Sequence, residues 1–260
     1  MMLQSERFEK ILSILENKRF ITLKEFEDSL HISKSTLRRD LMELEEMGKL
    51  TRMRGGASLT FHEQNGTSTS MEPHYLTRSH TNIDEKQRIA QAALQFVRSG
   101  DTIFLDAGTT VFELAKALKN TSGLMIATSD LLTAVDLTQN THNDLIVIGG
   151  QVRKNYYSMI GYFSDRVIAE MHADTAFISA DAVDFNHGLM TFSLSEVNGK
   201  KGMIASARES ILLCDHTKFD TVAFVSICPI IDIDKIITGK ELDETKQAAL
   251  HEYGIDVILV

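Results

Sequence analysis

The sequence predicts an α/β protein that begins with a small, mainly helical and winged module. Three observations carry this prediction. Apolar residues in 1–58 recur at helical spacing, residues 59–81 are rich in Ser, Thr, Asn, Gly and His, and from residue 82 apolar β-type runs alternate with helical stretches. Such alternation is typical of a mainly parallel sheet covered by helices. We therefore expect an N-terminal domain over 1–58, a linker over 59–81 and an α/β domain over 82–260.

The overall composition is that of an ordinary soluble chain. Its 260 residues are 43% hydrophobic and 24% charged, and no apolar run approaches the roughly 20 residues that a membrane-spanning helix needs. Charged residues stand near the start, where a signal peptide would need an apolar stretch, so we expect a cytoplasmic protein. Cys214 and Cys228 are too few for a disulfide framework, and we expect both to be buried free thiols.

Two helices are expected at the start of the chain. One face of the first, over 7–17, carries four apolar residues at helical spacing: Phe8, Ile11, Leu12 and Leu15. The second begins after Thr22, whose hydroxyl can cap it while Glu25, three residues on, completes a capping box. It ends near Leu30, and residues 31–33 are short enough to form the turn of a helix-turn-helix.

A third helix is expected to begin after Ser33, a good N-cap, and to end at Gly48. Three of its residues point to the core: Leu37, Leu41 and Leu44. Because each helical residue turns the direction by about 100°, four others lie near the opposite side: Ser35, Arg39, Met42 and Glu46. With Arg38 on the flank, the outer face is polar and basic near its N-terminal half, which is the layout of a recognition helix.

A small β-wing is expected over 49–57. Gly55 and Gly56 can make its turn or exit, and Arg52 and Arg54 can reach phosphate groups. The wing therefore extends the basic surface of the third helix.

The charge distribution supports a nucleic-acid partner for the N-terminal domain. Residues 1–58 hold 11 basic and 10 acidic side chains, whereas the rest of the chain holds 16 and 26. Six of the eleven bases fall between Lys34 and Arg54. The net charge of −9 therefore conceals a locally basic stretch, and the two domains are expected to have different partners.

The α/β domain is expected to alternate strands and helices. Eight strands are predicted, at residues 102–106, 124–128, 144–148, 175–179, 211–214, 222–227, 235–238 and 256–260. Helices are predicted in most intervals, at residues 84–98, 111–119, 131–139, 163–171, 194–209 and 241–253. Ligands of such sheets bind in the crevice at the carboxyl ends of the strands.

The turn after the first of these strands is a candidate anion site. Asp106 ends the strand, and Gly108, Thr109 and Thr110 form the bend into the next helix. Backbone N–H groups and two hydroxyls can hold a phosphate there. The next strand–helix junction repeats the arrangement with Thr128, Ser129 and Asp130. A structural interpretation stays open, because a Gly-Thr-Thr sequence is only a strand-to-helix turn in most proteins.

Together these residues resemble a known family. The segment from Ser33 to Leu41, followed by Leu44, Gly48 and Arg-Gly-Gly-Ala at 54–57, is similar to the DNA-binding signature of the DeoR family of bacterial transcriptional regulators. The α/β part resembles the family's sensor domain through these residues: Arg78, Asn82, Glu85, Lys86, residues 106–110, Gly149, Gly150, Arg153, Glu196, Lys200, Asp215 and Lys218. The resemblance runs through nearly the whole chain.

The resemblance implies a repressor of a carbohydrate-utilisation operon, controlled by a phosphorylated sugar. It implies a sensor fold similar to ribose-phosphate isomerase and glucosamine-phosphate deaminase. The implied DNA contacts are Lys34, Ser35, Thr36, Arg38, Arg39, Arg52 and Arg54. The implied effector contacts are Asp106, Gly108, Thr109, Thr110, Thr128, Ser129, Arg153, Asp181, Glu196, Lys200 and Lys218.

The expected partners are operator DNA, the phosphorylated sugar and further copies of the chain in a dimer or tetramer, with no membrane. No cofactor is expected, and no metal is assigned because the nine histidines show no ligand spacing. Within the family, residues 182–191, 193–196 and 215–218 look most like the lactose phosphotransferase repressors, which respond to tagatose 6-phosphate. Fructose, galactitol or other sugar phosphates fit the same residues.

The sequence departs from the family at two places. Alanines flank Asp181 where the family has glycines, which puts close backbone approach of a ligand there in doubt, and Gly239 follows Thr238 where relatives carry Asp. Several cations also have a structural interpretation: Arg153 and Lys218 can lie in solvent, and either arginine of the third helix can pair with an acidic neighbour, Asp40 or Glu43.

Other functions remain open. Glu196 and Lys200 have the i, i+4 spacing of a helix-surface ion pair, which is their default interpretation without the family. An isomerase-like enzyme would use carboxylates and lysines in the same cleft, although such an enzyme needs no operator-binding module. A helix-turn-helix that binds protein would leave the clustered arginines unexplained, and steep salt dependence distinguishes DNA binding from it.

Overall fold

The computed structural model describes residues 4–18, 20–46, 49–53, 55–59, 72–73, 75–140 and 142–260. The chain divides into two compact units: Met1–Thr67 with Leu76–Thr81, and Ser68–Tyr75 with Asn82–Val260. Most of the expected linker over 59–81 lies outside the described residues, as do Gly48 and Arg54. The last part of that segment forms a helix, α4 (Tyr75–His80), which the linker interpretation did not include.

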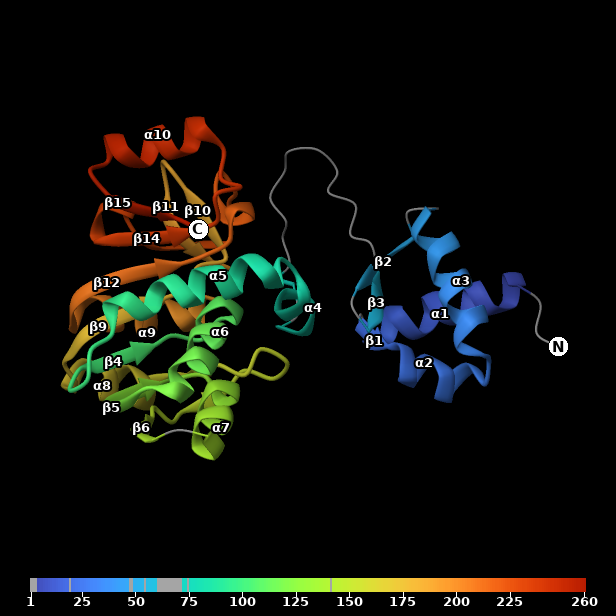
Figure 1. The fold of residues 1–260 in the computed structure, drawn as a ribbon, viewed down its shortest axis with the longest axis horizontal. Helices are drawn as coiled ribbons and strands as arrows, with labels where there is room; N and C mark the ends of the chain where they lie inside the picture. The colour runs from blue at the N-terminus through green and yellow to red at the C-terminus, as the bar shows by residue number, and fades with distance from the viewer. Residues whose placement is uncertain are drawn as a thin grey trace. The chain divides into compact units, whose positions relative to one another are not determined.

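The N-terminal unit is a helix-turn-helix with a three-stranded wing (Figure 1). Its helices are α1 (Gln4–Lys18), α2 (Leu23–Leu30) and α3 (Lys34–Glu46). Its strands are β1 (Phe20–Thr22), β2 (Leu50–Met53) and β3 (Gly56–Leu59), paired antiparallel in the order β1-β3-β2. The three helices and the wing are confirmed, and β1 adds a strand that the sequence did not predict.

The predicted caps explain where these helices begin. Thr22 Oγ1 accepts a hydrogen bond from Glu25 N at 3.2 Å, and Glu25 Oε2 accepts one from Thr22 N at 2.9 Å, which completes the capping box. His31 ends α2 in the left-handed region, at φ 51°. Ser33 Oγ accepts from Thr36 N at 3.2 Å at the start of α3.

The second unit is built on a seven-stranded parallel sheet in the order β15-β14-β12-β9-β4-β5-β6 (Figure 1). The strands are β4 (Thr102–Leu105), β5 (Ser122–Thr128), β6 (His142–Val147), β9 (Ala173–Ile178), β12 (Ala207–Leu213), β14 (Lys235–Thr238) and β15 (Asp256–Leu259). Seven of the eight predicted strands are confirmed in this sheet.

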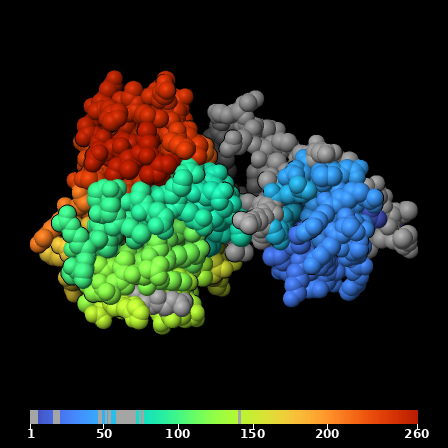
Figure 2. Space-filling model, viewed as in Figure 1, coloured from blue at the N-terminus to red at the C-terminus, as the bar shows by residue number. Residues whose placement is uncertain are grey.

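Helices cover both faces of the sheet. One face carries α5 (Ile83–Ala93), α6 (Thr109–Ala117) and α7 (Leu131–Asn140), and the other carries α8 (Tyr162–Glu170), α9 (Leu194–Ala205) and α10 (Glu244–Glu252). Because successive strand residues point to opposite faces, Ile103 and Leu105 pack with the first set while Phe104 packs with the second. Figure 2 shows α5 and the C-terminal elements around α10 on the surface of this unit.

Shorter elements complete the unit. The hairpin of β7 (Gln151–Val152) and β8 (Met159–Ile160) is antiparallel, as is a second sheet of β10 (Ala182–Asp184), β11 (Gly188–Thr191) and β13 (Val225–Cys228). In the described part of the unit, 3₁₀ turns lie at Leu94–Phe96, Leu118–Asn120, His216–Lys218 and Ile230–Asp232. The strand predicted at 222–227 corresponds to β13, which lies outside the main sheet. Cys214 and Cys228 are buried free thiols, as expected.

One helix prediction was too long. The helix expected over 194–209 ends at Ala205, and β12 begins at Ala207. Ala207 and Glu209 pair with β9 in parallel register, opposite Ala173 and Thr175. Sheet pairing with a distant strand therefore overrides the local helical pattern.

Candidate functional site

The outer face of α3 presents the residues predicted to contact DNA. Lys34, Ser35, Arg38 and Arg39 are exposed, whereas Thr36 is half-buried. The opposite face holds the buried core residues Leu37, Leu41 and Leu44. The predicted division of this helix into a core face and a basic outer face is confirmed.

An ion pair fixes α3 against α1 from inside. Asp40 is completely buried, and its carboxylate accepts two hydrogen bonds from Arg7, from Nε at 2.6 Å and from Nη2 at 2.9 Å. Such a forked contact is geometrically specific and strong. The sequence left open an ion pair of Arg38 or Arg39 with Asp40. The Asp40 carboxylate is instead bound by Arg7.

Arg52, on the wing, is less available for a phosphate contact than expected. Arg52 donates from its backbone N and from Nε to the Glu45 carboxylate, each at 2.8 Å, while its side chain stays 41% exposed. A phosphate contact by Arg52 would have to use the Nη groups of its guanidinium or replace this pair, and Arg54 lies outside the described residues.

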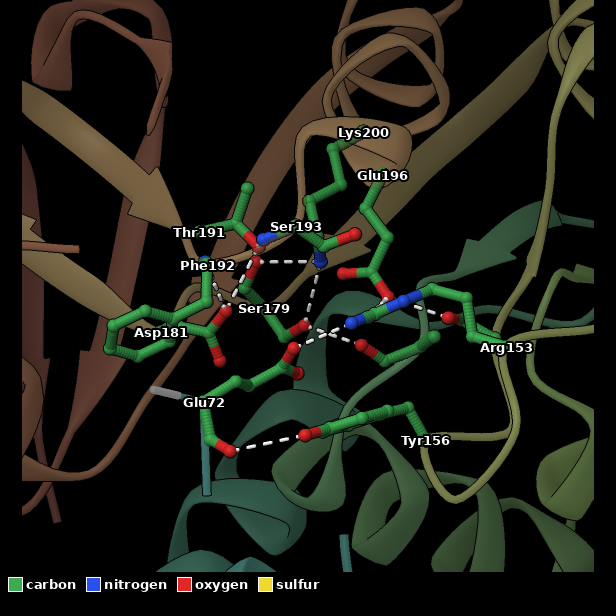
Figure 3. A network of polar contacts seen from close by, with 12 residues as sticks. Glu72, Arg153, Tyr156, Ser179, Asp181, Thr191, Phe192, Ser193, Glu196 and Lys200 are labelled. Atoms are coloured by element: carbon green, nitrogen blue, oxygen red, sulfur yellow. Dashed lines mark hydrogen bonds and ion pairs between the residues drawn. The ribbon is translucent and has the colours of Figure 1, made fainter. Parts of the chain in front are cut away.

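The candidate effector site of the second unit lies at the carboxyl ends of its strands. Asp106 follows β4, Ser179 follows β9, and Lys200 reaches them from α9. Asp106 Oδ2 accepts from Ser179 N and Oγ at 2.9 Å each and from Lys200 Nζ at 2.5 Å. Lys200 Nζ also donates to Ser179 O and Oγ, at 3.1 Å each (Figure 3). The side chains of Asp106 and Lys200 are only 4% exposed.

The charges around Lys200 keep it protonated. Its burial alone would lower its pKa, but the negative charges of Asp106, Glu196 and Asp181 and the hydrogen bond to Asp106 outweigh that effect and raise the pKa. Lys200 binds Asp106 rather than forming the helix-surface pair considered for Glu196 and Lys200.

A second group of charges meets on the loop between β7 and β8. Arg153 donates from Nη1 to Glu196, and from Nη2 to Glu72 Oε2 at 2.6 Å (Figure 3). Ser158 Oγ donates to Glu196 Oε1 at 2.5 Å. The Arg153 guanidinium lies over the ring of Tyr156, 4.4 Å from its centroid. Arg153 is only 16% exposed, so the interpretation as a solvated loop residue is wrong.

This network nearly fills the site. The cavity that remains has a volume of about 10 Å³, room for roughly one water molecule. Its polar lining comes from Asp106, Ser129, Ser158, Ser195, Glu196, Lys200 and Asp165. A phosphorylated sugar can therefore enter only if side chains of the network move.

The predicted anion turn at the start of α6 follows directly after the lining residues Asp106 and Ala107. Gly108 has an extended backbone, at φ 176°, and its glycine identity is required by close packing: a Cβ there would lie 2.5 Å from Ser179 Oγ. Phe112 N donates to Gly108 O in the first hydrogen bond of α6. The N–H groups of Thr109 and Thr110 come before that bond, at the end of a helix where N–H groups have no acceptor within the helix. Both threonines are nearly buried.

The second turn differs from the first, contrary to the predicted repeat. Thr128 is fully buried, and its hydroxyl donates to Leu105 O at 2.8 Å and accepts from Asp130 N at 3.1 Å. Asp130 Oδ1 caps α7 by accepting from Thr133 N at 2.8 Å. This helix start already holds a carboxylate of the protein, and Ser129 alone of the three turn residues lines the cavity.

The buried carboxylate of Asp130 is itself perturbed. Burial, with a contribution from the charge of Asp106, raises its pKa to about 6 against the pull of backbone hydrogen bonds from Thr133 and Leu132. Among the described residues, Asp130 Oδ2 has no hydrogen-bond partner.

Of the predicted effector residues, four line the cavity: Asp106, Ser129, Glu196 and Lys200. Arg153, Asp181 and Lys218 are not among the lining residues, and neither are the turn residues Gly108, Thr109, Thr110 and Thr128. Asp181 Oδ2 accepts from Thr191 Oγ1 at 2.9 Å and from Phe192 N at 3.0 Å (Figure 3). Lys218 is half-buried beyond β12, where its charge helps to lower the pKa of Asp215 against the opposing effect of burial. Their part in binding stays a prediction.

Sequence reasoning missed four residues that hold the site together: Glu72, Tyr156, Ser158 and Ser179. Glu72 stood in the expected linker, and its contact with Arg153 spans 81 positions of sequence. A polar residue after a strand was the only available signal for Ser179, which follows β9 as Asp106 follows β4.

One cluster has the side-chain types of a metal site. Ligand atoms of Glu85, His216 and Glu241 lie within 4.8 Å of one another. Glu85 already accepts hydrogen bonds from His216 N at 2.7 Å and Gly239 N at 3.1 Å, and Glu241 accepts from Arg88 at 2.5 Å. These hydrogen bonds account for the cluster, and we assign no metal to it.

Comparisons with known proteins cover both units. Residues 7–62 match the model of the DeoR-like helix-turn-helix domain, and residues 81–240 match that of the DeoR C-terminal sensor domain. The chain is 33% identical to the transcriptional regulator GolR of Listeria innocua over 97% of both chains. It is 30% identical to the glycerol-3-phosphate regulon repressor of Escherichia coli, over 99% of this chain and 100% of that one.

Among solved structures, ribose 5-phosphate isomerase A of Methanocaldococcus jannaschii is similar at 20% identity and a TM-score of 0.40, over 54% of this chain and 55% of that one. This likeness carries no statement about function. None of the described helices is long and apolar enough to cross a membrane. With matches to both domain models and to relatives along their whole length, the chain belongs to the DeoR family of helix-turn-helix transcriptional regulators.

Proposed function

We propose that the protein represses a carbohydrate-utilisation operon in the cytoplasm and that a phosphorylated sugar bound at the Asp106–Lys200 site controls its binding to the operator. The observation that carries the proposal is a cavity at the carboxyl edge of one parallel sheet that has three anion-favouring groups in or beside its lining: the buried Lys200 lines it, Arg153 binds the lining residue Glu196, and α6 begins just after the lining residues Asp106 and Ala107. Each of these groups favours an anion, and that edge is where such sheets bind ligands.

Each residue of the site has a chemical role in this proposal. The N–H groups and hydroxyls of Thr109 and Thr110 hold the phosphate, with Lys200 and Arg153 as its counter-charges. Asp106 and Glu196 accept hydrogen bonds from sugar hydroxyls once their present cations turn to the phosphate. The named function of the Escherichia coli relative, repression of a glycerol-3-phosphate regulon, supports a phosphorylated effector.

At the operator, Arg39 contacts a base edge or phosphate, and Lys34, Ser35 and Arg38 anchor the backbone. A dimer or tetramer joined through the α/β units presents paired recognition helices to a palindromic or repeated site. The effector binds one arrangement of the chain better than the other, and that difference in affinity limits the change in operator affinity.

An enzymatic function has less support. The relatives are regulators, and the carboxylates of Asp106 and Glu196 are ion-paired with Lys200 and Arg153 instead of standing as a free acid–base pair. We expect no turnover of ribose 5-phosphate or glucosamine 6-phosphate, measured by product formation over hours.

A thermal-shift screen tests the proposal. The panel contains tagatose 6-phosphate, fructose 6-phosphate, galactitol 1-phosphate and glycerol 3-phosphate, each matched with its unphosphorylated parent. Ligand at 100 times its Kd stabilises the fold by about 2.7 kcal/mol, so at least one phosphorylated compound should raise Tm while its parent does not. Absence of a shift with every phosphorylated compound would contradict the proposal.

A variant pair then locates the site. Thr109→Ala removes one hydroxyl of the turn before α6 and should weaken the response to the active compound. Thr245→Ala, at the start of α10 on the other face of the sheet, is the matched control and should leave the response unchanged.

A further inference from the structure

We infer that Glu72 is a built-in competitor of the effector: its carboxylate occupies the guanidinium of Arg153 in the free protein, and the anionic group of the effector displaces it. This inference rests on the proposed function, because it assigns the regulation of the same site. Glu72 lies in Ser68–Tyr75, a stretch of the α/β unit that comes between two segments of the N-terminal unit, Met1–Thr67 and Leu76–Thr81. Its displacement therefore changes how the chain next to the DNA-binding unit is held.

The stretch around Glu72 contacts the loop between β7 and β8. Glu72 Oε2 accepts from Arg153 Nη2 at 2.6 Å, and Tyr156 OH donates to Glu72 O at 3.1 Å (Figure 3). The rings of Tyr75 and Tyr157 meet edge to face, with centroids 5.4 Å apart. One short loop therefore holds both the candidate effector-binding arginine and the connecting segment.

The two carboxylates on Arg153 have different origins. Glu196 comes from α9 and is also held by Ser158, so it belongs to the rigid frame of the α/β unit. Glu72 precedes α4 and lies in none of the strands or helices of that unit. Its side chain can leave without breaking a strand or a helix.

The side chain of Glu72 is 7% exposed and binds Arg153, which in turn binds the cavity-lining residue Glu196. An arginine fork binds carboxylate and phosphate in the same geometry, and a phosphate brings more charge. The cavity beside Glu196 and Lys200 holds about one water, so an effector needs a side chain to withdraw. Glu72 is the anion whose withdrawal frees Arg153.

Competition of this kind has a measurable consequence. If only a fraction of molecules has Arg153 free, the apparent Kd of the effector rises by the inverse of that fraction. If the Glu72–Arg153 contact is closed in nine-tenths of the molecules, it raises the apparent Kd of the effector about tenfold. Removing the charge of Glu72 should therefore tighten effector binding, whereas loss of a merely structural contact would leave it unchanged or weaken it.

The test compares full-length wild type, Glu72→Gln and Glu209→Gln by isothermal titration calorimetry, with inorganic phosphate, tagatose 6-phosphate and glycerol 3-phosphate as probes. Glu209 pairs with Lys235 on β12 and β14, toward the amino ends of the strands, and serves as the matched control. We expect Glu72→Gln to lower the Kd of the probe that binds by about tenfold, and Glu209→Gln to match wild type.

Operator affinity without effector provides the second measurement. The effector either raises or lowers the operator Kd of wild type. Without effector, Glu72→Gln should shift the operator Kd in that same direction. An unchanged or higher effector Kd in Glu72→Gln, with wild type binding a probe, overturns the inference and leaves the proposed function standing. If wild type binds neither these probes nor any phosphorylated compound of the thermal-shift panel, the proposed function fails, and the inference falls with it.

If Glu72→Gln proves poorly folded, limited proteolysis of wild type gives the answer. The segment around Glu72 should be cut faster when the probe is bound. Equal or slower cutting at that segment would overturn the inference.

Discussion

The substitution Asp130→Asn should stabilise the α/β unit at neutral and alkaline pH. Asp130 is completely buried at the start of α7, with Oδ1 bound to Thr133 N and with its pKa raised from 3.8 to about 6. Asparagine keeps an acceptor for Thr133 N and carries no charge, and the cost of burying its amide N–H groups in place of Oδ2 does not change with pH. The variant therefore removes the cost of ionising a buried carboxyl.

The magnitude follows from the pKa shift. Because the folded pKa lies above the unfolded one, the folded protein holds the proton more tightly, and stability falls as pH rises from about 4 through 6. At about 1.4 kcal/mol per unit, a shift of about two units costs roughly 3 kcal/mol once the pH exceeds 7. The gain from Asp130→Asn should thus be larger at pH 8 than at pH 4, by roughly 2 kcal/mol.

Urea denaturation followed by tyrosine fluorescence is a suitable assay. The chain has no tryptophan, and its five tyrosines, at positions 75, 156, 157, 162 and 253, all belong to the α/β unit. Asp243→Asn is the control. Hydrogen bonds from Thr245 lower the pKa of this exposed N-cap, so the change of the variant's stability effect with pH should have the opposite sign. A gain for Asp130→Asn that is constant with pH, or larger at pH 4, would refute the reasoning.

Three further outcomes are expected. Arg39→Ala should weaken operator binding by about 1–3 kcal/mol in an anisotropy titration while the effector's thermal shift is kept; unchanged affinity would remove Arg39 from the interface. Lys200→Met should cost about 3–5 kcal/mol in urea melts, because Asp106 stays buried without its counter-charge, and adding Asp106→Asn should recover part of that loss. Gly108→Ala should cost about 1–3 kcal/mol through its clash with Ser179, and Ser179→Gly in the same chain should relieve it, an outcome that additive losses would contradict.

Most of the architecture could be predicted because local signals and tertiary packing agree. Buried parallel strands such as β4 and β14 are short apolar runs, and the capping box at Thr22 marks the start of α2. The end of α9 could not be predicted, because the residues after Ala205 have helical character locally and become a strand only by pairing with β9 and β14.

The site was harder to predict than the fold. The strand ends located Asp106, and family position supplied Arg153, Glu196 and Lys200, but sequence could not show which charges pair. Lys200 binds a carboxylate 94 positions away instead of its neighbour on the helix. Glu72 carried no local signal at all, because its role depends on where a connecting segment crosses the domain.

The central claim is that an anion bound beside Lys200 changes how tightly the N-terminal unit holds DNA. The direct measurement is the Kd of the full-length protein for a duplex selected by binding, at one fixed salt concentration, with and without the sugar phosphate that raises Tm. We expect the two Kd values to differ by roughly 5-fold to 150-fold, the usual range of coupling between sites. Equal Kd values with the sugar phosphate bound at saturation would contradict it.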